Sequence, residues 1–203
     1  MEIRIPEDCK KIHLLFSGGV DSTLLLYLLL LQKQHRPDLE IKCHGLLMSK
    51  RSIKFTRCSK ILDVLEQKFK VKIPFQNFDR KFILREFAEM IMSVEPGYVF
   101  SGCNKVLYFL EPTIYVEGDT PPIRGNAFNK FHIRPFIDMD KSQIISYYYK
   151  YNILDIFDMT YSCGFNTNTP CGNCYFCLER SWGLENCNIN YENSSEETLW
   201  QST

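Results

Sequence analysis

The heptapeptide Phe16-Ser17-Gly18-Gly19-Val20-Asp21-Ser22 begins at the last residue of the apolar run Lys11–Phe16 and precedes a leucine-rich segment. Paired glycines let backbone N–H groups approach an anion closely. A helix that begins directly after them presents free N–H groups and the positive end of its dipole to the same anion. Ser17 and Ser22 add hydroxyl donors, and Asp21 can cap the helix or help to hold Mg²⁺. The pattern predicts a phosphate-binding loop, with a simple capped strand-to-helix turn as the alternative.

The string S-G-G-V-D-S resembles the PP-loop signature of ATP pyrophosphatases, S-G-G-x-D-S. It differs from the Walker pattern, which ends in Gly-Lys-Ser/Thr, and from the dinucleotide pattern G-x-G-x-x-G. The resemblance implies that ATP with Mg²⁺ is cleaved between its α- and β-phosphates, so that AMP goes to the substrate while the loop holds pyrophosphate. The residues expected to bind ATP are Phe16, Ser17, Gly18, Gly19, Val20, Asp21, Ser22 and Thr23. Asp21 and Ser22 are also candidate catalytic residues.

Four cysteines, Cys163, Cys171, Cys174 and Cys177, are clustered near the C-terminus. The stretch from Met1 to Lys11 is polar, so we expect no secretory leader, and clustered cysteines then favour a metal over disulfides. Zinc prefers four soft ligands, and two-residue spacings let cysteines converge on one ion. Four thiolates leave no position for an activated water, so we predict one structural Zn²⁺ per chain. An iron–sulfur cluster uses the same ligands, and four unligated thiols are the remaining alternative.

Taken together, the two motifs are similar to those of the 7-cyano-7-deazaguanine synthase family. The similarity rests on the SGGVDS loop and on five further stretches, Tyr98–Asn104, Arg134–Phe136, Lys141, Thr160–Cys163 and Cys171–Arg180. It implies an adenine nucleotide alpha hydrolase-like fold and a reaction that converts 7-carboxy-7-deazaguanine and ammonia to the nitrile. The carboxylate is adenylated and amidated, and a second activation removes water, with release of AMP and pyrophosphate. Members of the family are cytoplasmic and often dimeric, so the resemblance allows a homodimer.

Further candidates stand beside these motifs. Arg57 lies in a basic stretch, 50–60, and Asn104 and Lys105 follow a predicted strand, so these three residues are candidate substrate ligands. Lys141 begins a predicted helix and is a candidate catalytic residue that stabilises phosphate charge. The alternatives are a solvated helix face for the basic stretch and ordinary surface positions for the two lysines.

The chain departs from the family pattern in two places. The family usually carries Y-G-Q-R-H after its second strand, and Leu46–Arg51 does not match that string. Cys103 stands where the family has an arginine. A second hypothesis therefore keeps the ATP chemistry but changes the acceptor, as in a ligase or amidating enzyme of a modification or defence cassette. A third hypothesis is a zinc-bearing tRNA-binding module, against which the intact loop and the neutral net charge argue.

The positioning elements follow from the apolar pattern. Strands are expected over Lys11–Phe16, Glu40–Met48, Val71–Phe78, Tyr98–Cys103 and His132–Ile137. Helices are expected over Asp21–Gln34 and Phe55–Phe69, from a cap at Asp79 to about Ser93, from near Asn104 to Pro112, and over Asp140–Tyr151 with Asp140 as N-cap. Alternating strands and helices predict an α/β fold with a doubly wound parallel sheet and a C-terminal zinc-binding segment.

Composition limits the remaining choices. The chain has 203 residues, 45% of them hydrophobic, and equal numbers of basic and acidic residues, 24 each. We predict an α/β domain over 1–158, the zinc segment over 159–186 packed on it, and an acidic tail over 187–203, with 117–130 as a long loop. No apolar run is long enough for a membrane span, so a cytoplasmic enzyme is expected. The expected partners are a small-molecule carboxylate and ammonia, and zero net charge argues against nucleic acid as a stable partner.

Overall fold

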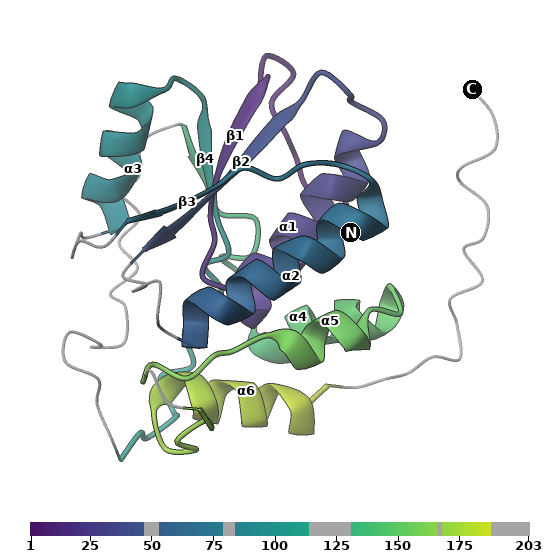
Figure 1. The fold of residues 1–203 in the computed structure, drawn as a ribbon. Helices are drawn as coiled ribbons and strands as arrows, with labels where there is room; N and C mark the ends of the chain where they lie inside the picture. Colours follow the sequence, from purple (N-terminus) through teal and green to yellow (C-terminus); the bar gives the residue numbers. More distant parts are fainter. Residues whose placement is uncertain (47–52, 79–83, 114–130, 166–167, 188–203) are drawn as a thin grey trace.

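The computed structural model describes residues 1–46, 53–78, 84–113, 131–165 and 168–187 (Figure 1). Within them lies a five-stranded sheet in the order β3-β2-β1-β4-β5, in which every neighbouring pair is parallel. The strands are β1 (Lys11–Leu15), β2 (Glu40–Leu46), β3 (Phe75–Phe78), β4 (Tyr98–Ser101) and β5 (His132–Ile133). The chain leaves β1 for β2 on one side and enters β4 on the other side of β1, so the strand order reverses at β1.

Helices cover both faces of this sheet. The described helices are α1 (Val20–Lys33), α2 (Ile53–Phe69), α3 (Leu84–Val94), α4 (Lys141–Lys150), α5 (Leu154–Met159) and α6 (Tyr175–Glu185). Figure 1 shows α1 and α2 side by side on one face and α3 on the other, while α4, α5 and α6 form a group beside α1 and α2. The predicted doubly wound α/β fold with a C-terminal cysteine segment is confirmed. No helix among the described residues is long and apolar enough to cross a membrane.

Two hydrophobic cores match the two faces. The larger joins the sheet to α1, α2, α4 and α5 and contains the fully buried leucines of α1. The smaller lies under α3 and consists of Leu15, Phe87, Ala88, Ile91 and Val99. Because α1 is apolar nearly all round, it can be sandwiched between the sheet and α4.

Some predicted elements differ from the observed ones. The strand predicted from Val71 begins only at Phe75, because Pro74 has no N–H to donate to the sheet. The Pro74 carbonyl accepts the N–H of Cys43 at 2.8 Å, and regular pairing with β2 begins from there. The last strand ends at Ile133, two residues before Pro135. Helix α4 has the predicted cap, since the Asp140 carboxylate accepts from the Gln143 N–H in a capping box. Asp79, the loop 117–130 and the residues after 187 lie outside the described residues, and the domain boundaries stay predictions.

The helix predicted from Asn104 to Pro112 is wrong, because residues 102–113 contain no helix. The reason is visible in the backbone donors of the segment. The Lys105 N–H donates to the Met139 carbonyl at 2.7 Å, and the Leu107 N–H donates to the Tyr175 hydroxyl at 2.9 Å. Tertiary partners thus satisfy the groups that a helix would have used.

Helix α6 packs tightly on α4 at Gly183, and this contact gives the first prediction. A Cβ at position 183 would lie 2.6 Å from Lys141 Cγ and 2.9 Å from Ile145 Cδ1. Gly183→Ala should therefore destabilise the protein by about 1–3 kcal/mol, the usual cost of overpacking, despite the higher helix propensity of alanine. Urea denaturation measures this effect. Ser181→Ala, at an exposed position of the same helix, is the matched control, and equal stability of the two variants would contradict the tight packing.

Candidate functional site

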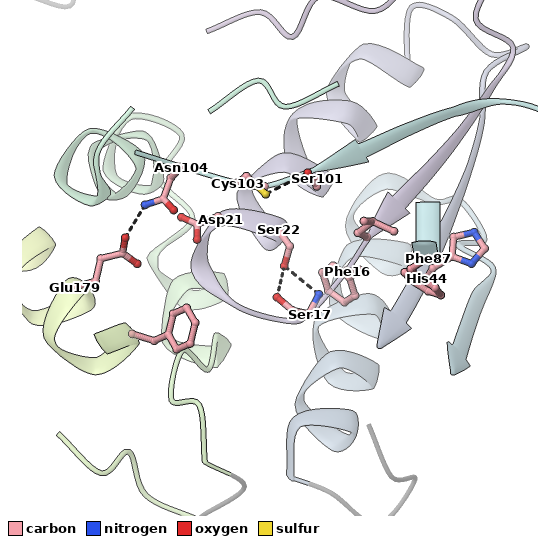
Figure 2. Close-up of a pocket in the computed structure, with 13 residues that line it drawn as sticks. Phe16, Ser17, Asp21, Ser22, His44, Phe87, Ser101, Cys103, Asn104 and Glu179 are labelled. Atoms are coloured by element: carbon pink, nitrogen blue, oxygen red, sulfur yellow. Dashed lines mark hydrogen bonds between the residues drawn. The ribbon is translucent and has the colours of Figure 1, made fainter. Parts of the chain in front are cut away.

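A pocket of about 250 Å³ opens at the carboxyl edge of the sheet, where the strand order reverses. Leu15 of β1 lies opposite both His44 of β2 and Ser101 of β4 in the register, and all three residues line this pocket. Ligands of open α/β sheets bind at such reversal points. Figure 2 shows the pocket residues in two groups, with Asn104 and Glu179 on one side of the loop and Phe87 and His44 on the other.

The loop after β1 has the geometry of an anion-binding turn. Gly18 has φ +70°, and a Cβ there would lie 2.6 Å from Cys58 Sγ, so only glycine fits at this position. Ser17 and Ser22 hold the turn from inside: their hydroxyl oxygens lie 3.1 Å apart, and the Ser17 N–H donates to Ser22 Oγ at 3.2 Å. No side chain caps the N-terminus of α1, where Gly19 is the N-cap residue. The helix end thus keeps its positive dipole free for a phosphate.

Two distant segments fix this loop in place. The Tyr161 N–H, from the segment that leads into the cysteine cluster, donates to the Gly18 carbonyl at 3.0 Å. The buried Tyr148 hydroxyl of α4 donates to the Val20 carbonyl at 2.6 Å. These two bonds tie the loop to the cysteine segment and to α4 without any ligand.

A charged network connects the loop to α4 and α6. Lys141 Nζ donates to both carboxylate oxygens of Asp21 at 2.6 Å and lies 3.1 Å from Glu179 Oε2. The Asn104 amide donates to Glu179 Oε1 at 2.9 Å. The side chains of Lys141 and Glu179 are each 3% exposed and that of Asp21 is 23% exposed. One ammonium faces two carboxylates, so this corner of the pocket has a formal charge of −1 and favours a cation.

Lys141 stays protonated in this setting. Burial alone lowers the pKa of a lysine, but the carboxylates of Asp21 and Glu179 outweigh it and raise the pKa of Lys141 above its usual value. The stabilisation that depends on this charge is therefore complete below the unfolded-state pKa near 10.5 and is lost only as the pH rises through the folded value. Lys141 is not among the pocket-lining residues, whereas Asp21 and Glu179 are. The lysine thus positions the Asp21 carboxylate from behind.

The four cysteines form one compact cluster. Their Sγ atoms all lie within 4.8 Å of one another, and Cys171 Sγ and Cys177 Sγ are 3.9 Å apart. Burial by itself raises the pKa of the Cys163 thiol, but the Cys171 N–H and further donors lower it to about 6. Cys174 is the N-cap of α6, where the helix dipole favours negative charge, but burial outweighs this and raises the pKa of the Cys174 thiol. The cluster has the chemistry of a tetrathiolate metal site.

The other predicted site residues are distributed unevenly. Of the ATP-loop candidates, Phe16, Ser17, Asp21 and Ser22 line the pocket, while Gly18, Gly19 and Val20 form the turn and Thr23 is fully buried behind it. Among the candidate substrate ligands, Asn104 lines the pocket. Lys105 is exposed, and Arg57 lies 4.9 Å over the Tyr161 ring beside the cysteine segment. Neither of the last two residues is among those that line the pocket.

Several pocket residues were not predicted as site residues, among them Glu179, His44 and Phe87. Glu179 is distant from the loop in the chain, although it lies within the C-terminal motif, where its neighbours drew attention as metal ligands. His44 and Phe87 were not singled out because their meeting depends on strand register and on the position of α3. The alternation of His44 with apolar residues in β2 was the available hint.

Three buried histidines predict an unusual pH dependence of stability. Burial, followed by the neighbouring His13, lowers the pKa of His44 to about 3, and burial with the nearby Arg134 lowers the pKa of His132 to about 4. Burial also lowers the pKa of His13. Below pH 6.5 the unfolded chain takes up protons that the folded chain does not, so stability falls as the pH drops towards 4.

Two such histidines give a loss of up to about 3 kcal/mol per pH unit near pH 5. Urea denaturation at pH 7, 6 and 5 measures the slope, and bound metal is followed in parallel because acid also releases metal from thiolates. His132→Gln should reduce the slope by about half. A stability that does not change between pH 7 and pH 5 would show that these rings are protonated in the folded state.

Comparison with known proteins supports the similarity predicted from the two motifs. Residues 121–188 match the family model described as "Queuosine biosynthesis protein QueC". The matched stretch includes α4, the four cysteines and α6. A comparison with curated protein sequences gave no significant match.

Two kinds of solved structure are similar to the chain. The U34-tRNA thiolase NcsA from Methanococcus maripaludis, solved with its [4Fe-4S] cluster, matches with TM-score 0.49 and 13% identity over 91% of this chain and 66% of that one. The Candida glabrata FMN adenylyltransferase in complex with FAD and inorganic pyrophosphate matches with TM-score 0.42 and 14% identity over 67% and 47%. The same enzyme with FMN and the ATP analogue AMPCPP matches with TM-score 0.42 and 15% identity over 70% and 49%. The chain thus spans 66% of the thiolase and about half of the adenylyltransferase.

Proposed function

We propose that this QueC-like PP-loop protein is an ATP-dependent ligase that adenylates a carboxylate, 7-carboxy-7-deazaguanine, and converts it with ammonia to 7-cyano-7-deazaguanine. The observation that carries the proposal is the position of Asp21. Its carboxylate lies within the SGGVDS string, at the first turn of an uncapped helix, where it lines the pocket and shares the Lys141 ammonium with Glu179. We place this activity in the cytoplasm, without nucleic acid as a stable partner.

The chemistry follows from what the loop can hold. A carboxylate is a poor electrophile, so it first attacks the α-phosphorus of ATP through an oxygen, and the bond from that phosphorus to the bridging β-oxygen breaks. Pyrophosphate leaves with the electron pair, and the Ser17 and Ser22 hydroxyls and the N-terminus of α1 stabilise its charge. Ammonia then displaces AMP to give the amide. The amide oxygen then attacks the α-phosphorus of a second ATP, and pyrophosphate leaves again. The C–O bond breaks as AMP departs with that oxygen, and the nitrogen loses its two protons, which leaves the nitrile.

The residues present fit a magnesium ion. Mg²⁺ prefers oxygen ligands and is commonly held by one or two carboxylates together with substrate phosphates. Asp21 and Glu179 both line the pocket, and their two charges exceed the single charge of Lys141. These two carboxylates would hold the ion, and the ion would neutralise phosphate charge during the displacement.

The cysteine cluster fits one zinc ion better than an iron–sulfur cluster. Four thiolates about 2.3 Å from a central ion lie about 3.8 Å apart at the corners of a tetrahedron. The Sγ atoms here lie within 4.8 Å of one another, with one pair at 3.9 Å. A four-iron cluster places a separate iron behind each thiolate and therefore spreads the sulfurs further apart. The site would hold the ion by Cys163, Cys171, Cys174 and Cys177 and supply rigidity rather than catalysis.

A different acceptor is the second candidate function, and Cys103 favours it. This half-buried thiol lines the pocket at the position where the family pattern has an arginine. Ser101 Oγ lies 3.4 Å from Cys103 Sγ, so the wall at this point is neutral and weakly polar. A pocket without the arginine charge would accept another carboxylate on a modified deazapurine, protein or nucleic acid.

One assay distinguishes the two candidates. The metal-loaded protein is incubated with ATP, Mg²⁺, ammonia and 7-carboxy-7-deazaguanine, and products are identified by mass spectrometry. The proposal expects AMP, pyrophosphate and the nitrile, with the amide as an intermediate. AMP release with neither amide nor nitrile would support a different acceptor. Absence of ATP binding and of pyrophosphate release would refute the enzyme assignment.

A further inference from the structure

Two buried histidines connect the end of α3 to the pocket. His13 of β1 and His44 of β2 lie on the sheet face that α3 covers, with His13 Nδ1 3.0 Å from His44 Nε2. The other ring nitrogen of His13, Nε2, lies 3.0 Å from the Glu95 carbonyl oxygen. Glu95 follows the last turn of α3, and its carboxylate pairs with Lys11 at 2.6 Å and Lys42 at 3.0 Å. The contacts from His44 through His13 to Glu95 are thus held in place at Glu95 by the two lysines.

The direction of the hydrogen bonds follows from this anchor. A carbonyl oxygen only accepts, so His13 Nε2 carries the proton and donates to Glu95. In a neutral ring the other nitrogen, His13 Nδ1, is then an acceptor, and His44 Nε2 must donate to it. His44 is neutral too and is therefore left with an unprotonated Nδ1. Burial lowers the pKa of both rings, which agrees with two neutral imidazoles.

This Nδ1 atom has no hydrogen-bond partner among the described residues, although His44 is only 3% exposed. A buried acceptor without a partner costs free energy, and in native proteins most such groups are paired with protein, water or ligand. Among the described residues, no other residue that lines the pocket has such a side-chain atom. His44 lines the pocket, and the apolar ring of Phe87 lies beside it with centroids 6.4 Å apart and an interplanar angle of 84°. An acceptor next to an aromatic wall suits a flat, partly apolar ligand that carries an N–H group.

We propose that His44 is a specificity-determining residue, whose Nδ1 accepts a hydrogen bond from an N–H group of a heteroaromatic ring bound against Phe87. The inference rests on the proposed function for the presence of such a ring, and two rings have this chemistry. Adenine offers its 6-amino group, and a deazaguanine offers its ring N–H and 2-amino groups. His13 is the positioning residue that fixes the tautomer of His44. If the proton of His13 moved from Nε2 to Nδ1, His44 Nε2 would have to accept it, and His44 Nδ1 would then carry a proton and become a donor.

The tautomer can be measured without activity. In ¹⁵N-labelled protein, long-range ¹H–¹⁵N spectra should show His44 protonated at Nε2 and not at Nδ1. Addition of the probe that carries the recognised ring, AMPCPP or 7-carboxy-7-deazaguanine, should shift the His44 Nδ1 resonance upfield, as expected for an acceptor that gains a hydrogen bond. A ring of His44 protonated at Nδ1 would overturn the inference even if the protein releases AMP. The inferred pattern without AMP release would count against the proposed function alone.

Binding of two probes then identifies the ring. His44→Gln keeps an amide near the position of Nε2, where it can still pair with His13, but removes the acceptor at Nδ1. Calorimetry with AMPCPP and with 7-carboxy-7-deazaguanine should show about tenfold weaker binding of one probe and unchanged binding of the other. If AMPCPP is the affected probe, its analogue without the 6-amino group should bind wild type and variant equally.

The matched control is His35→Gln at an exposed position, for which both affinities should stay at the wild-type value. Unchanged affinity of His44→Gln for both probes would overturn the inference. Equal losses with both probes, together with a lowered melting temperature, would also overturn it, because they would show a purely structural role for His44.

Discussion

Asp21→Asn is expected to lower the rate of AMP formation by about 10²–10³-fold while the protein stays folded and keeps its metal. The Asp21 carboxylate lines the pocket and is held by two 2.6 Å hydrogen bonds from Lys141 Nζ. An asparagine has nearly the same shape and still offers one oxygen to Lys141, but it has no charge with which to hold Mg²⁺ beside the phosphates. The effect should therefore fall on the chemical step. Pyrophosphate release in single-turnover experiments with saturating ATP measures it.

The stability of Asp21→Asn is the internal check. Lys141 keeps its ion pair with Glu179 at 3.1 Å, so the variant replaces a corner of charge −1 by a neutral one. We expect its free energy of unfolding to stay within about 1 kcal/mol of the wild-type value, since no buried charge loses its only partner. Lys141→Met is the opposite case, because it leaves two carboxylates without a cation and should cost about 3–5 kcal/mol.

Asp63→Asn is the matched control, because Asp63 is an exposed aspartate of α2 outside the pocket, and its rate should equal that of the wild type. If Asp21→Asn forms AMP at the wild-type rate, the Asp21 carboxylate has no role in the reaction. A collapse of stability in Asp21→Asn would instead show that the residue serves the fold.

The loop and the cap at Asp140 could be predicted because each depends on neighbours in the sequence. Gly18 adopts φ +70°, and two adjacent glycines after an apolar run indicate a turn with such a backbone conformation. The Asp140 cap needs only Gln143, three residues further on. The cysteine cluster could be predicted for the same reason, since its four ligands lie in one short stretch.

The partners of these local features could not be predicted. Whether Lys141 faces phosphate or a carboxylate depends on the packing of α4 against α6. Gly183 permits this close packing, but the hydrophobic periodicity of the two helices does not reveal it. The pairing of His13 with His44 depends on the offset between neighbouring strands. The wrongly predicted helix after Asn104 has the same origin. Its backbone N–H groups donate to Met139 and Tyr175, which lie in distant parts of the chain. Local pattern thus fixes conformation at the loop and at the Asp140 cap, while long-range packing decides which groups meet and overrides the pattern after Asn104.

Cys174→Ser is expected to cost the protein its metal first and its stability as a consequence. Serine has a hard hydroxyl in place of a soft thiolate, and three remaining thiolates hold zinc much more weakly. A bound metal stabilises the folded state by about 4 kcal/mol when present at a thousand times its dissociation constant. We therefore expect an unfolding free energy lower by about that amount and a metal content far below one ion per chain, measured by elemental analysis.

The same substitution tests how the metal site serves the nucleotide site. Tyr161 lies two residues before Cys163, and its N–H holds the Gly18 carbonyl at 3.0 Å. Arg180 of α6 binds the Thr160 carbonyl and hydroxyl at 3.1 and 2.7 Å, so loss of the cluster should loosen this segment from both ends. Affinity for AMPCPP should fall together with metal content.

Cys187→Ser, at a half-buried cysteine outside the cluster, is the control and should keep metal, stability and affinity. Elemental analysis of the wild type also decides the identity of the metal, because one zinc per chain agrees with the compact sulfur geometry and several irons would contradict it. A Cys174→Ser variant that loses zinc yet binds AMPCPP as tightly as the wild type would show that the Tyr161–Gly18 hydrogen bond holds without the metal. The loop would then be held by two contacts that do not involve the cysteine segment. These are the hydrogen bond from the Tyr148 hydroxyl to the Val20 carbonyl and the one between the Ser17 and Ser22 hydroxyls.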